Sequence, residues 1–400
     1  MTMSGKTRNT YRDQAATVYL TSFGNDLAYA TAVLDAHTDP GQAAVETYGK
    51  IAEILADSRM EIVHERAFGS LSCHAAVVAG RAAALGGRGI SAETPMNYLQ
   101  GRPLWGEGLA GVNLMAVRAR EAQPIWTIND EAGDPAGRAW RHSGATFLFL
   151  QGLHGREPNG RADNSRSAQA DRMFEQAEKL LRGQKTDYRS VTRTWIYLSK
   201  ILDWYGDFNE VRNRQYTNFG LMPEPGSPGG NHLLLPASTG IEGDGAAGAA
   251  ATMDVLATVL GPDSEVEIHQ MTNRKQKDAF QYGSAFSRGA AIRMPGVTWI
   301  SVSGTAAIDD KGVSLLLGDF RGQMNMTLDT VEALIAQEGA TLADLCDMSL
   351  FLKRPEDVEA FGEVLAERGL EGIPGVPVIA DVCRDELLFE SDGAAVVARP

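Results

Sequence analysis

An acidic residue near the end of the chain stands in apolar company. Glu390 directly follows Leu387, Leu388 and Phe389, on a segment with the pattern of a last strand. A carboxyl group in apolar surroundings has a raised pKa and can act as a general acid near neutral pH. The residue type and its setting therefore indicate acid catalysis at Glu390. The alternative is a carboxylate that caps or pairs at a strand end.

Two more side chains precede this acid at short range. Cys383 and Arg384 are separated from the Glu390 strand by a short turn at Asp385 and Glu386, so we expect a closing strand pair that carries all three side chains. Cys383 would then shape the site or assist the chemistry, and Arg384 would bind an anion. The alternative for Cys383 is a small buried hydrophobe.

A second group comes from the segment RTWIYLSKI at 193–201. Strand alternation places Arg193, Trp195 and Tyr197 on one face. A cation with two aromatic rings can bind a planar anionic ring by ion pairing, stacking and a phenolic hydrogen bond. Arg212 follows in FNEVR at 208–212 and adds a cation. The alternative is that the two aromatic residues pack and Arg193 forms an ordinary salt bridge.

A glycine-rich segment, PASTGIEGDGAAGAA at 236–250, follows an apolar run. Ser238, Thr239 and Gly240 offer hydroxyl and backbone N–H groups to an anion. The glycines do not fit the GxGxxG spacing before a helix, so a dinucleotide site is not expected. The alternative is a plain glycine-rich turn.

A basic segment lies at 273–289 in an otherwise acidic chain. It contains Arg274, Lys275 and Arg288, with Tyr282 among other aromatic residues. Cations in this number favour a carboxylate substrate, which Arg288 and Tyr282 would contact. The alternative is a solvated basic loop.

The common catalytic and cofactor motifs are not found. The sequence has no GxSxG elbow, no Walker A loop and no HExxH, and its seven histidines show no pair at metal-ligand spacing. The three cysteines are too few for a disulfide framework and are not spaced as metal ligands. We therefore expect neither a metal nor a cofactor.

Composition narrows the classes of partner. The 400 residues carry a net charge of −14, which disfavours binding to phosphate backbones. We find no apolar run of about 18 residues, the length that a membrane span needs. The N-terminus lacks the apolar core of a signal peptide, so the cytoplasm is the expected location.

The helices and strands expected from the residue spacing, which must position these side chains, predict an α+β fold built from a repeated unit. Met324, Leu328, Val331, Leu334 and Ile335 recur at helical spacing, and Thr298, Ile300 and Val302 alternate with Trp299 as in a strand. We expect helices on one face of each mixed sheet, with the other faces meeting at the centre. The expected helices lie at 42–55, 73–89, 168–183, 207–220, 323–340 and 355–369, and the expected strands at 17–24, 61–70, 106–119, 144–152, 190–201, 233–243, 295–309, 347–354 and 376–397.

The unit occurs three times. We expect a flexible N-terminus at 1–14, a diverged unit at 15–130, a second unit at 138–260 and a C-terminal unit at 265–400. Three copies in one chain predict a pseudo-trimer with ligand sites in the clefts between copies.

The C-terminal unit resembles the Rid (YjgF) family of reactive-intermediate deaminases. The resemblance lies in VSGTAAID, EALIAQEGATLADL, SLFLKRPEDVEAF and DVCRDELLFESDG, and it covers about 130 residues. Members of that family are homotrimers with sites between subunits, so the chain resembles a fused version. Ordinary members hold the substrate carboxylate with an arginine on the penultimate strand. The matching position in this chain falls near Pro377 or Val378, so that arginine is lost here.

The chorismatases, which are multi-unit relatives of the Rid fold, resemble the chain more closely. The matching pieces are the R-x-W-x-Y pattern from Arg193, the F-N-x-x-R pattern that ends at Arg212, PASTGI, FSRG and the ending from Cys383 to Glu390. In that family the last-strand glutamate is the acid. The subgroup that releases a hydroxybenzoate has a cysteine and a glycine in its pocket, similar to Cys383 and Gly240.

These observations lead to one hypothesis and its alternatives. We expect a secondary-metabolism enzyme that removes pyruvate from chorismate or a similar small anionic ring acid by acid catalysis at Glu390. Tyr197, which would orient an oxygen, and Cys383, which would shape or assist the ring step, are the other expected catalytic residues. A cyclase or aromatase on the same scaffold, an imine or enamine deaminase, and a purely binding protein are the alternatives. The expected partner is a small molecule, without nucleic acid or membrane, and the expected state is a monomeric pseudo-trimer or a homodimer.

Overall fold

The computed structural model describes most of the chain. The described residues are 6–12, 16–23, 26–34, 39–118, 124–157, 163–222, 235–276 and 279–399, and for residues 281 and 282 only the backbone is described.

Within these residues one unit is repeated three times: three strands, a helix, a strand, a second helix and two strands. The first unit consists of β1 (Lys6–Arg12), β2 (Ala16–Phe23), β3 (Leu27–Leu34), α1 (Pro40–Ser58), β4 (Met60–Gly69), α2 (His74–Gly86), β5 (Asn97–Gln100) and β6 (Leu109–Arg118). The second unit consists of β7 (Trp126–Asn129), β8 (Pro135–His142), β9 (Ala145–Leu153), α3 (Arg166–Gly183), β10 (Val191–Leu198), α4 (Tyr205–Asn218), β11 (Ala237–Glu242) and β12 (Ala251–Leu260). The third unit consists of β13 (Glu267–Met271), β14 (Gly289–Met294), β15 (Val297–Ala306), α5 (Phe320–Ile335), β16 (Leu345–Leu352), α6 (Val358–Glu367), β17 (Gly375–Ile379) and β18 (Phe389–Ala398).

Each unit forms one six-stranded mixed sheet, and the strand order is the same in all three: β1-β2-β3-β6-β4-β5, β7-β8-β9-β12-β10-β11 and β13-β14-β15-β18-β16-β17. The last strand in sequence lies in the middle of each sheet, antiparallel to both neighbours, and one parallel pair lies at the edge. The predicted α+β class with mixed sheets is thereby confirmed.

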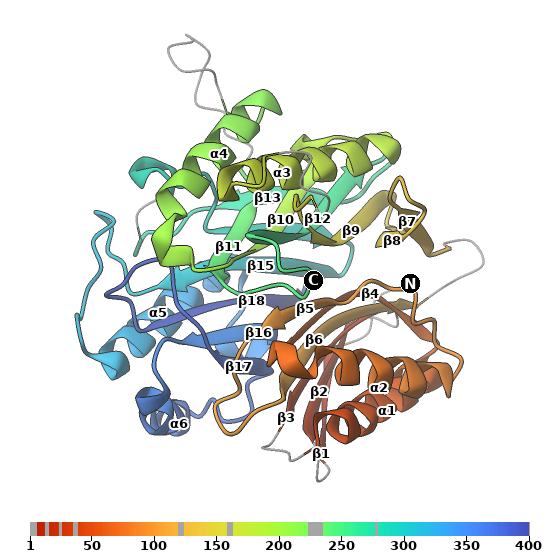
Figure 1. Cartoon of the computed structure of the whole chain (residues 1–400), viewed down its shortest axis with the longest axis horizontal. Helices are drawn as coiled ribbons and strands as arrows, with labels where there is room; N and C mark the ends of the chain where they lie inside the picture. Colours follow the sequence, from red (N-terminus) through yellow and green to blue (C-terminus); the bar gives the residue numbers. More distant parts are fainter. Residues whose placement is uncertain are drawn as a thin grey trace.

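The helices cover the outer face of each sheet (Figure 1). In α5 the residues Met324, Leu328, Val331 and Leu334 are buried as their spacing predicted, and the Asp319 carboxylate caps the helix by accepting from the Gly322 N–H. The inner faces of the three sheets share one apolar core, and each sheet contacts the other two. The expected meeting of sheet faces at the centre is therefore confirmed, and threefold symmetry stays a prediction.

Four local expectations are wrong. Lys6–Arg12 is not loose, because it pairs with β2 along seven residues. Trp126–Asn129 belongs to the second sheet and not to the first unit, because it pairs with β8. The segment around Ala237 is not the last strand of its sheet. It forms β11 at the sheet edge, and the last strand in sequence is β12, which lies in the middle of the sheet. Finally, β17 and β18 do not pair with each other, because β16 lies between them.

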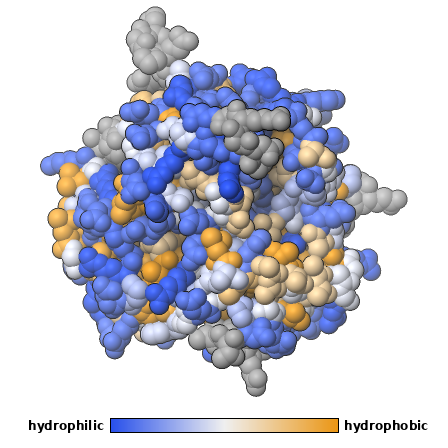
Figure 2. All heavy atoms as spheres, in the orientation of Figure 1, coloured by the Kyte–Doolittle hydropathy of each residue, from blue (hydrophilic) through white to orange (hydrophobic). Residues whose placement is uncertain are grey.

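The surface in the orientation of Figure 1 is mostly hydrophilic, and weakly apolar residues gather over α1 and α2 (Figure 2). In the part of the chain that the structure describes, no helix is long and apolar enough to cross a membrane.

Candidate active site

A small cavity of about 180 Å³ lies where the second and third units meet. Its walls come from α4 and β11 of the second unit, and from β15, β18 and the connecting loops of the third. The lining residues are Tyr205, Asn209, Ser238, Gly240, Gln276, Ser284, Phe286, Arg288, Gly304, Ala306, Ile308, Cys383, Arg384 and Glu390. A site at a seam between two units is what the repeated sequence predicted.

Glu390 is the acidic group of this cavity. It is the second residue of β18 and only 4% exposed. Burial first, and the charge of Asp392 second, raise the pKa of Glu390 to about 8, although Arg288, Arg384 and Arg193 act in the opposite direction. Glu390 is therefore protonated at neutral pH and has a proton to donate. The apolar residues before it in the sequence indicated this state correctly.

Gly304 makes room for the acid. A Cβ atom at this position would overlap the Glu390 Oε1 atom and would lie 3.3 Å from the Thr239 Cγ2 atom. The absence of a side chain at Gly304 therefore lets the carboxyl group lie against β15.

Two arginines contribute positive charge to the wall. Arg288 is 2% exposed, and its guanidinium lies 5.4 Å from the Phe286 ring centroid. Arg384 is held by hydrogen bonds that its Nη1 donates to the Gly312 carbonyl (2.9 Å) and the Ser314 hydroxyl (3.1 Å). Two cations beside a neutral acid suit a ligand with carboxylate groups.

Three of the smaller predicted residues also line the cavity. Ser238 is fixed by its backbone N–H, which donates to Ser303 Oγ at 2.9 Å. Gly240 faces the ring of Tyr205, which an added Cβ would contact at an ordinary distance of 3.4 Å. Burial raises the pKa of Cys383 to about 12. Cys383 is thus a neutral thiol that shapes the wall and not a thiolate nucleophile.

Arg193, Trp195 and Tyr197 share a face of β10, as the alternation predicted, but they do not line the cavity. They point into the core between the sheets. The Nη2 group of Arg193 donates to Thr239 Oγ1 (2.6 Å) and Asp392 Oδ2 (3.0 Å), and its guanidinium lies over Trp195. Arg193 and Thr239 thus have partners within the protein, and none of the four residues lines the cavity, so their predicted substrate contacts stay predictions.

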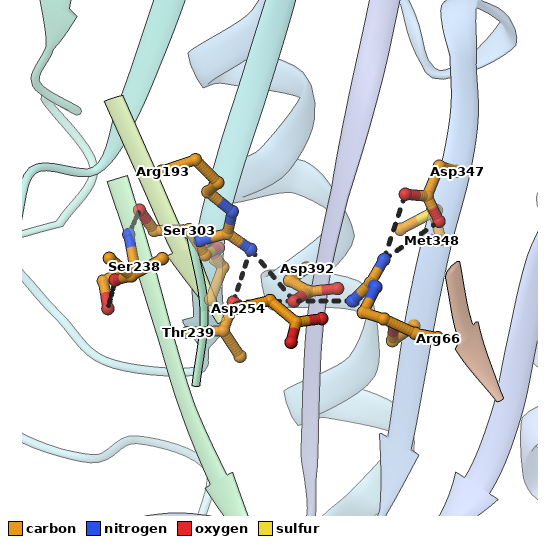
Figure 3. Close-up of polar contacts among 12 residues, drawn as sticks. Arg66, Arg193, Ser238, Thr239, Asp254, Ser303, Asp347, Met348 and Asp392 are labelled. Atoms are coloured by element: carbon orange, nitrogen blue, oxygen red, sulfur yellow. Dashed lines mark hydrogen bonds and ion pairs between the residues drawn. The ribbon is translucent and has the colours of Figure 1, made fainter. Parts of the chain in front are cut away.

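The first unit completes this central network (Figure 3). Arg66 of β4 donates from Nη2 to both oxygens of Asp347, at 3.2 and 3.0 Å, and from Nη1 to the Tyr197 hydroxyl at 3.2 Å. Its Nη1 also lies 3.8 Å from Asp392 Oδ2. Side chains from all three sheets therefore form one buried chain of charges, which ends two residues from Glu390.

The other two predicted binding residues have different positions. The Arg212 guanidinium lies 5.5 Å from the ring centroids of both Phe208 and Phe286 and donates to Asn209 Oδ1. Arg212 thus contacts Asn209 and Phe286, two residues of the cavity wall, without lining the cavity itself. Tyr282 ends the short helix Ala279–Tyr282, and its side chain lies outside the described part of the structure.

The sheet register shows that the other two units lack this acid. Glu390 pairs with Phe351 of β16, and the corresponding pairs are Thr252 with Tyr197 and Gly111 with Phe68. A carboxylic acid therefore stands at one of the three equivalent positions, which restricts acid chemistry at these positions to the seam between the second and third units.

Several wall residues were not predicted from the sequence: Tyr205, Asn209, Gln276, Ser284, Phe286 and Gly304. Asn209 and Phe286 stand inside the FNEVR and FSRG segments, so the motifs contained a signal for them. Gln276 comes from a loop that reaches the cavity only through the tertiary fold, and nothing in its local sequence marks it.

A larger groove of about 640 Å³ is lined by the loop before β10 and the start of β10, by Leu235 and Pro236 just before β11, by the end of β12, and by β13 and β14. Its acidic residue is Asp187, whose pKa is lowered by hydrogen bonds from Arg189. Since this carboxylate has no proton to donate near neutral pH, the smaller cavity is the better candidate for acid catalysis.

Comparison with known proteins agrees with this geometry. The model of the family described as Endoribonuclease L-PSP matches residues 278–375. A 3-hydroxybenzoate synthase of Streptomyces hygroscopicus is 25% identical over 71% of this chain and 84% of its own length, and a chorismatase of the same organism is 26% identical over 72% and 86%. A crystal structure of chorismatase covers 84% of this chain and 93% of its own, with 20% identity and a TM-score of 0.60.

The chain has three sheets of the same topology with a cavity at a seam between two of them, and its residues 278–375 match the L-PSP model, so it resembles the Rid superfamily. Along most of its length the chain is chorismatase-like in sequence and in fold, and its relatives indicate an enzyme.

Proposed function

We propose that the protein removes pyruvate from chorismate, a cyclic acid that carries an enolpyruvyl ether. The observation that carries the proposal is the buried, protonated Glu390 beside Arg288 and Arg384 in a small cavity. Enol ether cleavage needs a proton donor, and chorismate has two carboxylates that need cations. The names of the relatives support the same substrate. The acidic surface and the expected cytoplasmic location fit an enzyme of small-molecule metabolism.

The proposed reaction begins with proton transfer from Glu390 to the methylene carbon of the enol ether. The resulting cation at the ether carbon is attacked by an oxygen nucleophile. When the nucleophile is water, the bond between the ether carbon and the ring oxygen then breaks and releases pyruvate. Glu390 recovers its proton from the nucleophile or from solvent. Arg288 and Arg384, in place of Arg193, hold the carboxylates in this scheme.

The nucleophile decides the second product. Attack by water consumes one water molecule and gives a dihydroxycyclohexadiene acid. Attack by the ring hydroxyl returns a proton to Glu390 and forms a cyclic ketal at the ether carbon. The ether carbon then separates from its original ring oxygen, and the attacking oxygen leaves its ring carbon as the carbonyl oxygen of pyruvate. Transfer of a ring proton to the remaining oxygen gives a hydroxybenzoate, and no net water is consumed. We propose the hydroxybenzoate, because Gly240 and Cys383 line the cavity and one relative is a 3-hydroxybenzoate synthase.

The test is incubation of purified protein with chorismate, followed by a coupled pyruvate assay and chromatography of the ring products. We expect pyruvate and a hydroxybenzoate in equal amounts. Pyruvate together with the dihydroxycyclohexadiene acid would support the proposed cleavage of chorismate but would contradict the proposed hydroxybenzoate product. No consumption of chorismate at high enzyme concentration would overturn the proposal and favour a cyclase or aromatase.

The pH dependence follows from the state of Glu390. Since the protonated form donates the proton and its pKa is about 8, kcat/KM should be high at pH 6–7 and fall about tenfold per pH unit above pH 8. The measurement is a profile of kcat/KM from pH 5.5 to 10. A loss of activity already above pH 5 would contradict a raised pKa.

Gly304→Ala tests the space behind the acid. The new Cβ would displace the Glu390 carboxyl group, which is the end of a flexible side chain, so the fold should persist. We expect kcat to fall about tenfold to a hundredfold, as for a misplaced catalytic group. The matched control is Gly362→Ala in α6, where no atom lies within 4 Å of the new Cβ. Unchanged kcat in Gly304→Ala would argue against the position assigned to the acid.

A further inference from the structure

Gln276 is a buried glutamine on the cavity wall whose side-chain amide has one free end. The residue is 3% exposed, and its Nε2 donates to the Ala306 carbonyl at 3.0 Å. Among the described residues no group donates to its Oε1. A carbonyl oxygen can only accept, so the amide nitrogen must face Ala306. The orientation of the amide, with its oxygen as the free acceptor, is thereby fixed.

A buried acceptor without a donor is unfavourable in a folded protein. The neighbouring wall shows how such groups are usually satisfied: the Ser238 hydroxyl accepts from Thr194 Oγ1 at 2.8 Å. Gln276 differs because its free oxygen belongs to a residue that lines the cavity. A donor that enters with the ligand would satisfy this oxygen.

The amide also lies close to the acid. Ala306, which holds the Gln276 nitrogen, is paired with Glu390 across β15 and β18. A ligand that receives the proton of Glu390 therefore presents its neighbouring atoms to Gln276.

We propose that Gln276 Oε1 accepts a hydrogen bond from a hydroxyl group on the ring of the substrate. This assignment rests on the proposed function and extends it from the carboxylates to the ring. Carboxylates cannot donate to Oε1 and are left to Arg288 and Arg384. An amide takes up no proton at neutral pH, so Gln276 orients the hydroxyl and is not its base.

The test compares ligands that differ by one hydroxyl and need no turnover. Binding of benzoate, 3-hydroxybenzoate and 4-hydroxybenzoate to the full-length protein is measured by calorimetry. We expect the wild type to bind at least one hydroxybenzoate about tenfold more tightly than benzoate, the effect of one well-made hydrogen bond. In Gln276→Leu this preference should shrink to about twofold or less.

A second glutamine is the matched control. Gln323 is also buried, but its amide donates to the carbonyls of Leu315, Leu316 and Glu386 and accepts from the Leu388 N–H. It does not line the cavity, so Gln323→Leu should keep the preference for the hydroxyl group.

Two results would overturn the assignment: equal binding of benzoate and both hydroxybenzoates by the wild type, or a preference that survives in Gln276→Leu. The first needs no variant, so it decides the matter even where Gln276→Leu does not fold. Pyruvate release from chorismate without any hydroxyl preference would overturn the role of Gln276 alone. Absence of both pyruvate release and binding would overturn the proposed function together with this assignment.

Discussion

Glu390→Gln should lower kcat for pyruvate release by about 10²–10⁴, the usual contribution of a general acid. Glutamine has nearly the same shape as protonated glutamic acid but cannot give up a proton. Because Glu390 is already neutral at pH 7, with a pKa of about 8, the substitution buries no new charge and removes none. Stability and ligand binding should therefore change little. The measurement is the single-turnover rate of pyruvate release at pH 7, together with a thermal melt.

Glu386→Gln is the matched control for this variant. Glu386 lies in the exposed loop before β18, and hydrogen bonding to Ser314 lowers its pKa. It cannot serve as an acid near neutral pH and does not line the cavity, so the control should keep full activity. A folded Glu390→Gln protein with wild-type turnover would exclude Glu390 as the proton donor.

The repeated units and the raised pKa of Glu390 could be predicted because each depends on residues that are close together in the sequence. The spacing of Met324 and Leu328 is enough for a buried helix face, and the apolar residues before Glu390 are enough for a raised pKa. The strand β12 gave a weaker signal, because its apolar residues follow a glycine- and alanine-rich stretch and do not alternate clearly. The central strands of these sheets are buried on both faces, which removes the alternation that marks a half-exposed strand.

The surroundings of Arg193, Trp195 and Tyr197 could not be predicted from the local sequence. Alternation correctly placed the three side chains on one face of β10, but it cannot tell whether that face meets a cavity or another sheet. Here the face meets the first unit, and Arg66 lies 5.0 Å from the Trp195 ring centroid. A strand position near the cavity and one near the core look alike in sequence, because both combine cations with aromatic residues.

The same network gives the first unit a role, although none of the residues that the structure describes in that unit lines the cavity. Arg66 is fully buried and bonds to Asp347 of the third unit and Tyr197 of the second. Burial raises the pKa of Asp347, and Arg66 opposes that rise. Removal of the cation would leave a carboxylate in the core without its ionic partner.

Arg66→Met should therefore lower the free energy of unfolding by about 3–5 kcal/mol at pH 8, as expected for a broken buried ion pair. Without Arg66, the folded-state pKa of Asp347 lies further above its unfolded-state value. Stability of the variant is then highest at low pH and falls as the pH rises through that pKa. The loss relative to the wild type should be smaller at pH 5 than at pH 8. Denaturant unfolding at both pH values measures it.

Two comparisons separate a broken ion pair from lost packing. Arg321→Met removes an exposed arginine that pairs with Glu363 and Glu367, and it should lower stability much less than Arg66→Met does, because solvent screens exposed ion pairs. Arg66→Met with Asp347→Leu replaces both partners by apolar side chains and should recover much of the lost stability, because no buried charge is then unpaired. If Arg66→Met alone is as stable as the wild type at pH 8, the three sheets are held together by their apolar core, and the buried charges add nothing to it.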